Sequence, residues 1–466
     1  MASSSWVLCL LAFLPAVVLL GSAILDKDRS LLSPFWSLLF PVIVGTTLKV
    51  TLFQMGVDSP SLMQNFSGLG INDLTTSLLQ VTGFFLLTSL AYFLAGGLRS
   101  PILQTAKPSF RTVQLNAQAM LVITVLVCVC SMIVLYVFVK DVGGSFGSLS
   151  EISAKRRFSD ASGAASAGGV YRAIITMARL NAILLFSIWY CCRSSRQNPL
   201  LLLGIILSAS VTVISCVVLS SRSQLVFLLI PAVGILKFEK VFSWKHLIIV
   251  LFATLLLANA VAILRPRNDS PPLTISEVIK RSNEVPLQLT GAINGTDVTK
   301  ITRIRKHFDA NSDFFHGRTL VDWPLQMVPR SLWPEKPQVG LSYYLASEVY
   351  GGTANVDMGG VPASLLGEFY INFSWIGVFV GAIVYGVALE WFFFRMLPHR
   401  DSTLTSVSIF LITLPLVTYL LNMGEFGATS VRVIVDVVSG LILLSAYKLI
   451  AIREFRVVGF EVRESE

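Results

Sequence analysis

The segment LLLANAVAILRPRNDSPP, residues 255–272, marks the point where the sequence changes from apolar to polar. Apolar residues continue as far as Leu264, and a polar stretch then runs from Arg265 to Val361 before a further apolar block begins. Apolar blocks of about 18 or more residues are long enough to cross the hydrocarbon core of a bilayer as helices. The sequence therefore predicts a helical membrane protein in which one long polar segment separates two groups of spans.

The overall composition agrees with a membrane protein. Hydrophobic residues make up 54% of the chain and charged residues only 14%, whereas soluble domains carry about 25% charged residues. We count eleven apolar blocks that are candidates for spans, at 5–24, 31–53, 75–97, 116–139, 170–191, 199–219, 221–237, 244–264, 362–394, 402–423 and 428–450.

These blocks predict an all-α polytopic fold with three parts. An N-terminal transmembrane bundle of eight spans covers 1–264, and it includes a Gly-, Ser- and Ala-rich loop at 141–169 that we expect to be mobile. The segment 265–361 forms one large loop with short helices, and 362–466 forms a C-terminal bundle of three spans with a tail.

Lys and Arg residues predict the orientation, because short cytoplasmic loops retain them. When alternate short loops are assigned to opposite sides, sixteen Lys and Arg residues fall on one side and four on the other. We therefore expect a cytoplasmic C-terminus, with the N-terminus and 265–361 on the outer side. The net charge of +9 follows from this retention, and no basic stripe interleaved with aromatic residues indicates nucleic-acid binding.

Cysteine and histidine residues do not suggest a cofactor. The six cysteines lie in or beside the apolar blocks and none lies in 265–361, so we expect no disulfide framework there. The four histidines are scattered, and no metal-ligand spacing occurs. The sequence therefore predicts neither a metal site nor a cofactor.

Ionisable residues inside spans are costly in lipid and are candidates for function. Near the predicted outer ends of the spans, the cations are Lys49, Arg179, Arg222 and Arg432. The acids at a similar level are Glu368, Glu425 and Asp436. The excess of cations predicts an anion site, and the planar fork of arginine suits phosphate.

Each of these cations also has a purely structural explanation. Arg432 and Asp436 are four residues apart and can pair on one helix face. Arg222 and Lys49 can extend to lipid headgroups. Arg179, about ten residues from either end of its span, can pair with a buried acid. The sequence alone leaves both explanations open.

Glu368 opens the ninth apolar block, beside Gly367, Phe369 and Tyr370. A carboxylate at the mouth of a bundle can act as a general base. It can equally be the structural partner of an arginine, and both interpretations remain.

Three short motifs carry a resemblance to a known family. They are Gly317-Arg318-Thr319-Leu320, the run VPRSLWPEKP at 328–337, and GEFYINF at 367–373. With Ser220-Ser221-Arg222-Ser223 at a span boundary and one dominant loop in the C-terminal half, the chain resembles bacterial oligosaccharide repeat-unit polymerases of the Wzy type. These are also called O-antigen polymerases. The Pro-Arg-x-x-Trp-Pro-x-Lys-Pro run is the most specific of the motifs.

The resemblance implies a metal-independent glycosyltransferase at the periplasmic face of the bacterial inner membrane. Such enzymes move a growing glycan from one undecaprenyl pyrophosphate carrier to the terminal sugar of another lipid-linked repeat unit. The implied partners are these two lipid-linked glycans, membrane lipids and a chain-length regulator protein. The implied fold is that of lipid-dependent GT-C-type transferases and O-antigen ligases.

The resemblance also implies roles for residues. Glu368 is the expected base, with Glu425 and His316 as alternatives, and Arg318 and Arg330 are expected to assist catalysis. The residues expected to hold pyrophosphate are Arg222, Lys336, Arg179, Lys49 and Arg432. The residues expected to contact sugar are Trp323, Trp333, His316 and Tyr370, although tryptophan is also a common membrane anchor.

Two other functions stay open at this point. One is a ligase that passes glycan to lipid A core or to protein. The other is a non-enzymatic transporter or flippase of lipid-linked sugars, which the lack of visibly matching halves disfavours. Many relatives carry an arginine just before the last span, where this chain reads Asn422-Met423-Gly424-Glu425. We expect Arg432 to substitute for it.

Overall fold

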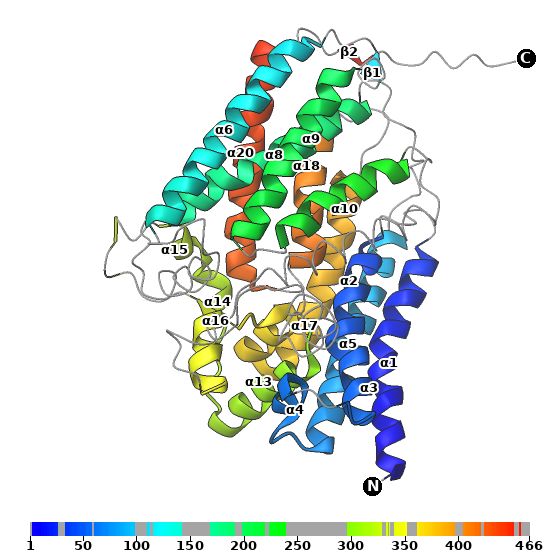
Figure 1. Cartoon of the computed structure of the whole chain (residues 1–466). Coiled ribbons are helices and arrows are strands. Elements are labelled where there is room, and N and C mark those ends of the chain that lie inside the picture. Colours follow the sequence, from blue (N-terminus) through cyan, green and yellow to red (C-terminus); the bar gives the residue numbers. More distant parts are fainter. Residues whose placement is uncertain are drawn as a thin grey trace, which may run out of the picture.

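The computed structural model of the chain is almost entirely helical in the residues it describes (Figure 1). It describes residues 2–26, 33–57, 60–97, 110–111, 115–141, 168–191, 198–219, 223–238, 296–328, 332–333, 335, 340–351, 361–396, 404–420, 424–451 and 456–457. The strands in these ranges are β1 (Phe110–Arg111) and β2 (Arg456–Val457), which pair antiparallel. The all-α prediction is confirmed.

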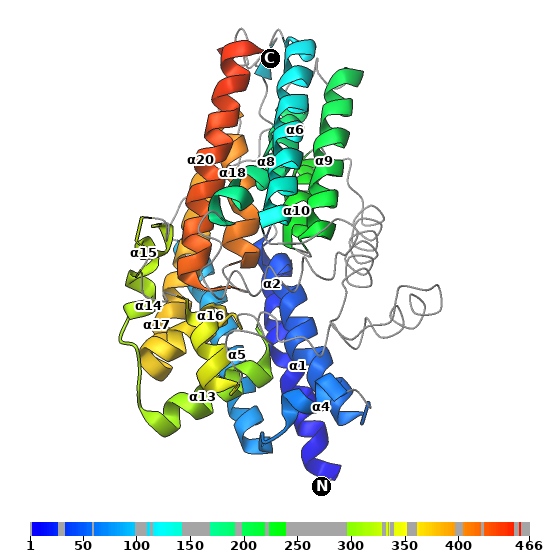
Figure 2. The same ribbon diagram turned by 60° about the vertical axis from the view of Figure 1, so that its left-hand side comes forward.

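Two groups of helices build the described structure (Figures 1 and 2). The first contains α1 (Ala2–Leu25), α2 (Pro34–Val42), η2 (Ile43–Leu48), α3 (Lys49–Gln54), α4 (Pro60–Phe66), α5 (Ile71–Gly97) and α17 (Ser364–Met396). The second contains α6 (Ala117–Asp141), α8 (Gly168–Cys191), α9 (Pro199–Val218), α10 (Ser223–Phe238), α18 (Leu404–Pro415), η5 (Leu416–Leu420) and α20 (Phe426–Ile450). Each group has an apolar core, and the C-terminal part of α17 also adds Phe392 and Phe393 to the core of the second group.

The segment expected to form a long loop contributes short helices to the first group and to the junction with the second. These are α13 (Val298–Asn311), α14 (Arg318–Val321), α15 (Trp323–Met327), α16 (Leu341–Tyr344) and η4 (Leu345–Val349). Helix α13 contacts α5 and α17, whereas α14 and α15 contact α20. The N-terminal end of α1 and helix α13 lie at one end of the molecule, and β2 lies at the other (Figure 1).

The prediction of a multi-pass membrane protein is confirmed. Seven helices in the described ranges are long and apolar enough to cross a membrane. They are Trp6–Leu25, Pro34–Gln54, Ile71–Gly96, Ala117–Asp141, Pro199–Val218, Ser364–Met396 and Phe426–Ile450. Two shorter apolar helices are Ala173–Trp189 and Leu404–Thr418. The eighth apolar block, 244–264, lies outside the described residues, so the count of eleven spans stays a prediction.

The second apolar block is interrupted by a π-helix, η2, between α2 and α3. At this point the backbone just before α13 approaches very closely: a Cβ added to Gly45 would lie 2.9 Å from the carbonyl oxygen of Thr296. The Thr46 hydroxyl donates a hydrogen bond to the same oxygen over 2.9 Å. Glycine is required here because the neighbouring backbone occupies the space of a side chain.

The sequence suggested a single span at 362–394, but the structure does not form one straight helix there. Helix α17 breaks at Phe373 (φ −141°, ψ 21°) and Ser374 (φ 54°, ψ −145°). A Cβ on Gly377 would lie 2.3 Å from the Phe369 carbonyl oxygen, although eight residues span about 12 Å along a straight helix. Residues 364–372, here called the re-entrant arm, therefore fold back on 375–396.

Candidate active site

The re-entrant arm ends against the segment that precedes α14. The backbone N–H of Phe315 donates to the carbonyl of Ile371 (3.1 Å), and that of His316 donates to the carbonyl of Asn372 (3.0 Å). The N–H of Gly317 donates to the Asn372 side-chain oxygen over 2.9 Å. Carbonyls at the end of a helix lack partners within it, and this segment supplies them.

Unusual backbone conformations gather at the same place. His316 (φ 49°) and Gly317 (φ 90°) precede α14, Ser364 (φ 63°) starts the re-entrant arm, and Ser374 (φ 54°) follows it. Positive φ values cost non-glycine residues roughly 1–3 kcal/mol and persist only where the surrounding structure enforces them. The arm is therefore held in place by its contacts rather than by its own backbone preferences.

Glu368 lies at the centre of this junction and is only 1% exposed. Its Oε1 accepts a hydrogen bond from the Thr319 hydroxyl over 2.9 Å. Its Oε2 accepts one from the backbone N–H of Phe426 over 2.6 Å. Phe426 is the first residue of α20, and the free N–H groups and dipole of a helix N-terminus favour a carboxylate. Three separate elements, α14, α17 and α20, thus hold one carboxyl group.

Asn372 completes the arrangement around Glu368. Its side-chain N–H group donates to the Thr319 oxygen (2.6 Å) and to the carbonyl of Glu368 (2.8 Å). The motifs 317–320 and 367–373 are therefore brought together in space. The sequence interpretation named Glu368 but missed Thr319 and Asn372, although both lie within the motifs that it quoted.

Glu425 immediately precedes α20 and lies beside the same junction. The Ser342 hydroxyl donates to its Oε1. Burial, and then repulsion from Glu368, raises the pKa of Glu425 to about 8. Glu425 and Glu368 thus lie close enough at the start of α20 to affect each other's charge.

A cationic cluster lies farther along α20. The Arg179 guanidinium of α8 donates to the side-chain oxygens of Gln224 (2.6 Å) and Asp436 (2.5 Å). The Arg432 Nε lies 3.9 Å from the same Asp436 carboxylate. Both guanidinium groups lie over the ring of Phe227, 5.3 Å and 4.6 Å from its centroid. Two cations therefore share one acid.

Arg432 is six residues beyond Phe426, which corresponds to about 9 Å along a helix. Its side chain keeps 27% of its surface exposed, whereas Arg179 keeps 2%. Arg179 and Arg432 thus have the structural partner that the sequence allowed, and the pair still retains an excess positive charge.

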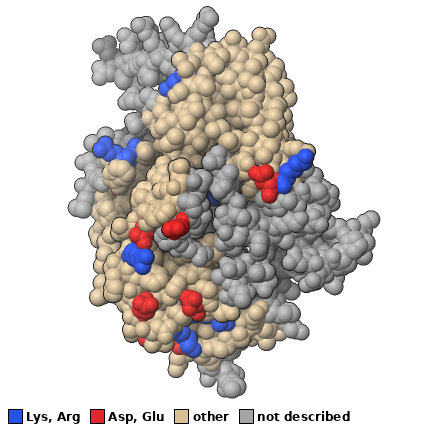
Figure 3. All heavy atoms as spheres, turned by 90° about the vertical axis from the view of Figure 1, so that its left-hand side faces the viewer, with Lys and Arg blue, Asp and Glu red and all other residues tan. Residues whose placement is uncertain are grey.

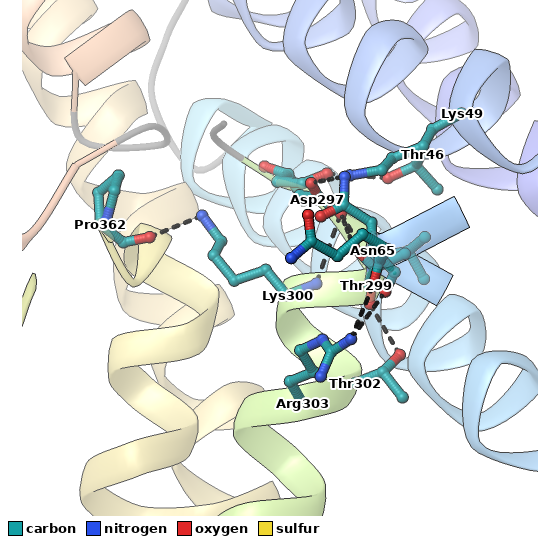
Figure 4. Close-up of polar contacts among 12 residues, drawn as sticks. Thr46, Lys49, Asn65, Asp297, Thr299, Lys300, Thr302, Arg303 and Pro362 are labelled. Carbon is teal, nitrogen blue, oxygen red and sulfur yellow. Dashed lines mark hydrogen bonds and ion pairs between the residues drawn. The ribbon is translucent and has the colours of Figure 1, made fainter. Parts of the chain in front are cut away.

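Lys49 has a fully buried partner. Its Nζ lies 2.5 Å from the Asp297 carboxylate, and neither side chain is exposed (Figure 4). Asp297 also caps α13 by accepting from the N–H of Thr299 over 2.9 Å. Lys49 thus fastens the start of α13 to the N-terminal helices, and a contact of Lys49 with phosphate stays a prediction.

The remaining candidate residues are spread more widely. Arg318 is 77% exposed and pairs with Asp322 over 3.1 Å. His316 and Trp333 are exposed, Trp323 is partly buried, and Tyr370 is buried and donates its hydroxyl proton to Asp309 of α13. Arg222, Arg330 and Lys336 lie outside the described residues.

Charged and apolar side chains both appear on the described surface. Figure 3 shows most of the acidic side chains of one face over its lower half, with fewer charged side chains above them. Many large apolar side chains of α6 and α17 are exposed, among them Val122, Leu126, Ile133, Ile376 and Val384. Such surfaces are typical of lipid contact.

Comparison with known proteins links this site to one family. Residues 225–423 match the family model described as O-antigen polysaccharide polymerase Wzy. No curated protein and no solved structure matches the chain. The matched range contains both interlocked motifs and Glu368 itself. The resemblance to Wzy-type polymerases, drawn from these short motifs, is therefore confirmed over residues 225–423 of this multi-pass membrane protein.

Proposed function

We propose that this protein polymerises undecaprenyl-pyrophosphate-linked oligosaccharide repeat units at the periplasmic face of the inner membrane. It transfers the growing glycan from one lipid carrier to the terminal sugar of a lipid-linked acceptor. The single observation that carries this proposal is the meeting of motifs 317–320 and 367–373 around the buried carboxylate of Glu368, within the family-matched range.

Glu368 acts as the general base of the proposed reaction. As the acceptor hydroxyl oxygen bonds to the anomeric carbon of the donor sugar, its proton passes to the Glu368 carboxylate. Thr319, Asn372 and the N–H of Phe426 fix the orientation of that carboxylate. A fixed base of this kind typically accelerates a reaction by about 10²–10⁴-fold.

The bond that breaks joins the anomeric carbon to pyrophosphate, and its electron pair leaves with the phosphate oxygen. Fixed cations stabilise that developing charge. Arg432 and Arg179 are the described candidates, because they bring a net positive charge to α20. Arg222, Arg330 and Lys336 complete the proposed anion site, and Arg318 lies beside Thr319 on α14. With protein cations in this role, the proposed reaction is independent of metal ions.

The proposed sidedness follows the Lys and Arg count together with the placement of α13. The N-terminal end of α1 lies at the same end of the molecule as α13 (Figure 2), in agreement with a periplasmic N-terminus and loop. The division into 1–264, 265–361 and 362–466, the GT-C-type fold group and a chain-length regulator as partner belong to the same proposal. Trp323, Trp333, His316 and Tyr370 are proposed to line the path of the glycan.

The test uses purified protein in liposomes, a lipid-linked repeat unit and a metal chelator. The proposal predicts a ladder of glycans on the lipid carrier that differ by one repeat unit. Glycan that transfers only when lipid A core or an acceptor protein is supplied would identify a ligase instead. Repeat units that cross the bilayer without any lengthening would identify a transporter.

A further inference from the structure

A second polar cluster lies beside the active site, and the proposed mechanism does not use it. Lys300, in the first turn of α13, is 0% exposed, and its Nζ donates to the carbonyl oxygen of Pro362 over 2.7 Å (Figure 4). Pro362 precedes Ser364, the first residue of the re-entrant arm. This lysine thus links α13 directly to the start of the arm that carries Glu368.

Burial of a lysine is costly, because its ammonium group loses its hydration. Three charged groups face Lys300 from the elements around it: Asp297 attracts it, Lys49 of α3 repels it, and Glu425 before α20 attracts it. Burial is the main cause that lowers the pKa of Lys300 to about 7. Lys300 therefore interacts electrostatically with both members of the Lys49–Asp297 pair and with Glu425.

The entry to the arm is held from two sides. The N–H of Val361 donates to the carbonyl of Ser342 over 2.9 Å, and the hydroxyl of Ser342 donates to Glu425. On the other side, Lys300 holds Pro362. Proline has no N–H of its own, so its carbonyl is the polar backbone group through which residue 362 can be fixed.

The arm also packs on the face of α13 that carries Lys300. A Cβ on Gly367 would lie 3.2 Å from the Ile304 side chain. Lys300 and Ile304 are four residues apart and share one helix face. Gly367 is adjacent to Glu368, so any shift of the arm relative to α13 moves the catalytic carboxylate.

From this geometry we infer that Lys300 is a positioning residue for Glu368, which it fixes by holding the Pro362 carbonyl, with the Lys49–Asp297 pair as its support. This inference rests on the proposed transferase function. The hydrogen bond from Lys300 goes to the backbone carbonyl of Pro362, so Lys300 acts on Glu368 through the placement of the arm.

The experiment compares Lys300→Met and Lys300→Gln with wild type in the lipid-linked polymerisation assay. Methionine removes both the charge and the hydrogen-bond donor, whereas glutamine keeps a donor. We expect Lys300→Met to lower kcat at least tenfold, with the acceptor KM within about threefold of wild type. The kcat of Lys300→Gln should lie between that of wild type and that of Lys300→Met. Lys306→Met is the matched control, because Lys306 lies on the exposed side of α13 and pairs with Asp73.

The split between kcat and KM separates positioning from general damage, because a misplaced Glu368 slows the chemical step without weakening the binding of the acceptor.

Melting temperature and gel filtration identify which variants are folded, and if the methionine variant is not, the glutamine variant decides. A folded variant with wild-type kcat, or with a change in KM alone, would overturn the inference. A wild-type protein that forms no polymer would instead overturn the proposed function itself.

Discussion

Gly377→Ala is the substitution that tests most sharply whether the re-entrant arm positions the carboxylate of Glu368, the proposed catalytic base. The added Cβ would lie 2.3 Å from the carbonyl oxygen of Phe369 and 2.8 Å from the Cβ of Phe373. Ordinary van der Waals contact begins at 3.4 Å, so the arm has to move by roughly 1 Å. Phe369 directly follows Glu368, and the carboxylate therefore moves with it.

The expected effect is large on catalysis and moderate on stability. A misplacement of about 1 Å lowers a rate by roughly 10²-fold, which corresponds to about 2.7 kcal/mol in the activation barrier. Overpacking of a core costs about 1–3 kcal/mol in folding stability. We expect Gly377→Ala to reach the membrane and to remain monodisperse, but to polymerise about 100-fold more slowly. The assay is initial-rate polymerisation of a lipid-linked repeat unit, normalised to folded protein.

Two control glycines separate the arm from other effects. A Cβ on Gly386, also in α17, would lie 2.3 Å from the Thr88 carbonyl of α5. Gly386→Ala thus creates a clash of the same size away from the arm and should lower stability while it changes kcat by less than tenfold. Gly83 has only a contact of 4.0 Å to Phe379, and Gly83→Ala should be near neutral. Gly377→Ala with wild-type kcat would refute the role of the arm.

Three further predictions follow from the buried charges. Asp297→Asn leaves Lys49 buried without a countercharge and should destabilise the protein by about 3–5 kcal/mol; a thermal melt in detergent measures this, and a Lys49→Met, Asp297→Asn double variant should recover part of it. Glu425 binds its proton in the folded state up to about pH 8 but loses it near pH 4.3 when unfolded. The free energy of unfolding should therefore fall as pH rises between these values. Glu425→Gln should remove this fall, and a melting temperature with an unchanged pH dependence in that variant would contradict the prediction. Arg432→Ala should reduce kcat/KM for the donor lipid by roughly 10–100-fold, because a charge-assisted hydrogen bond is worth about 1.5–3 kcal/mol; donor titration at fixed acceptor checks it, and an unchanged value would remove Arg432 from the anion site.

Much of the helical framework could be predicted because lipid imposes a simple rule on sequence. A span needs a long apolar run, and the blocks that lead to α1, α5, α6 and α20 are continuous. The break in α17 was hidden for the same reason. Asn372 and Ser374 are too few polar residues to interrupt the apolar block, so its mean hydropathy does not reveal the reversal.

Helix α13 shows a signal that was present in the sequence but not used. Val298, Ile301, Ile304 and Phe308 recur at helical spacing and are all buried, and Asp297 is a favourable cap before them. Because charged residues separate these apolar positions, the sequence was interpreted only as short helices within 265–361, without the bounds of this helix. In the structure, this helix contacts the start of the re-entrant arm through Lys300 and Ile304.

The sequence predicted which motifs contribute to the site, but not which of their residues contact one another. Glu368 was identified from its neighbours, whereas its contacts with Thr319 and Phe426 join segments 49 and 58 residues away in sequence. The structural use of Lys49 was hidden because its partner, Asp297, is 248 residues distant. Long-range pairing of this kind leaves no trace in local sequence spacing.

Glu368→Gln shows whether the Glu368 carboxylate accepts the proton of the acceptor hydroxyl. Glutamine keeps the size of the side chain and an oxygen for the Thr319 hydroxyl or the Phe426 N–H, but it cannot accept a proton at neutral pH. We predict that the folded variant still binds lipid-linked repeat units but forms no ladder, with a rate reduced by about 10²–10⁴-fold. A glutamine variant that builds the ladder at the wild-type rate would contradict the account.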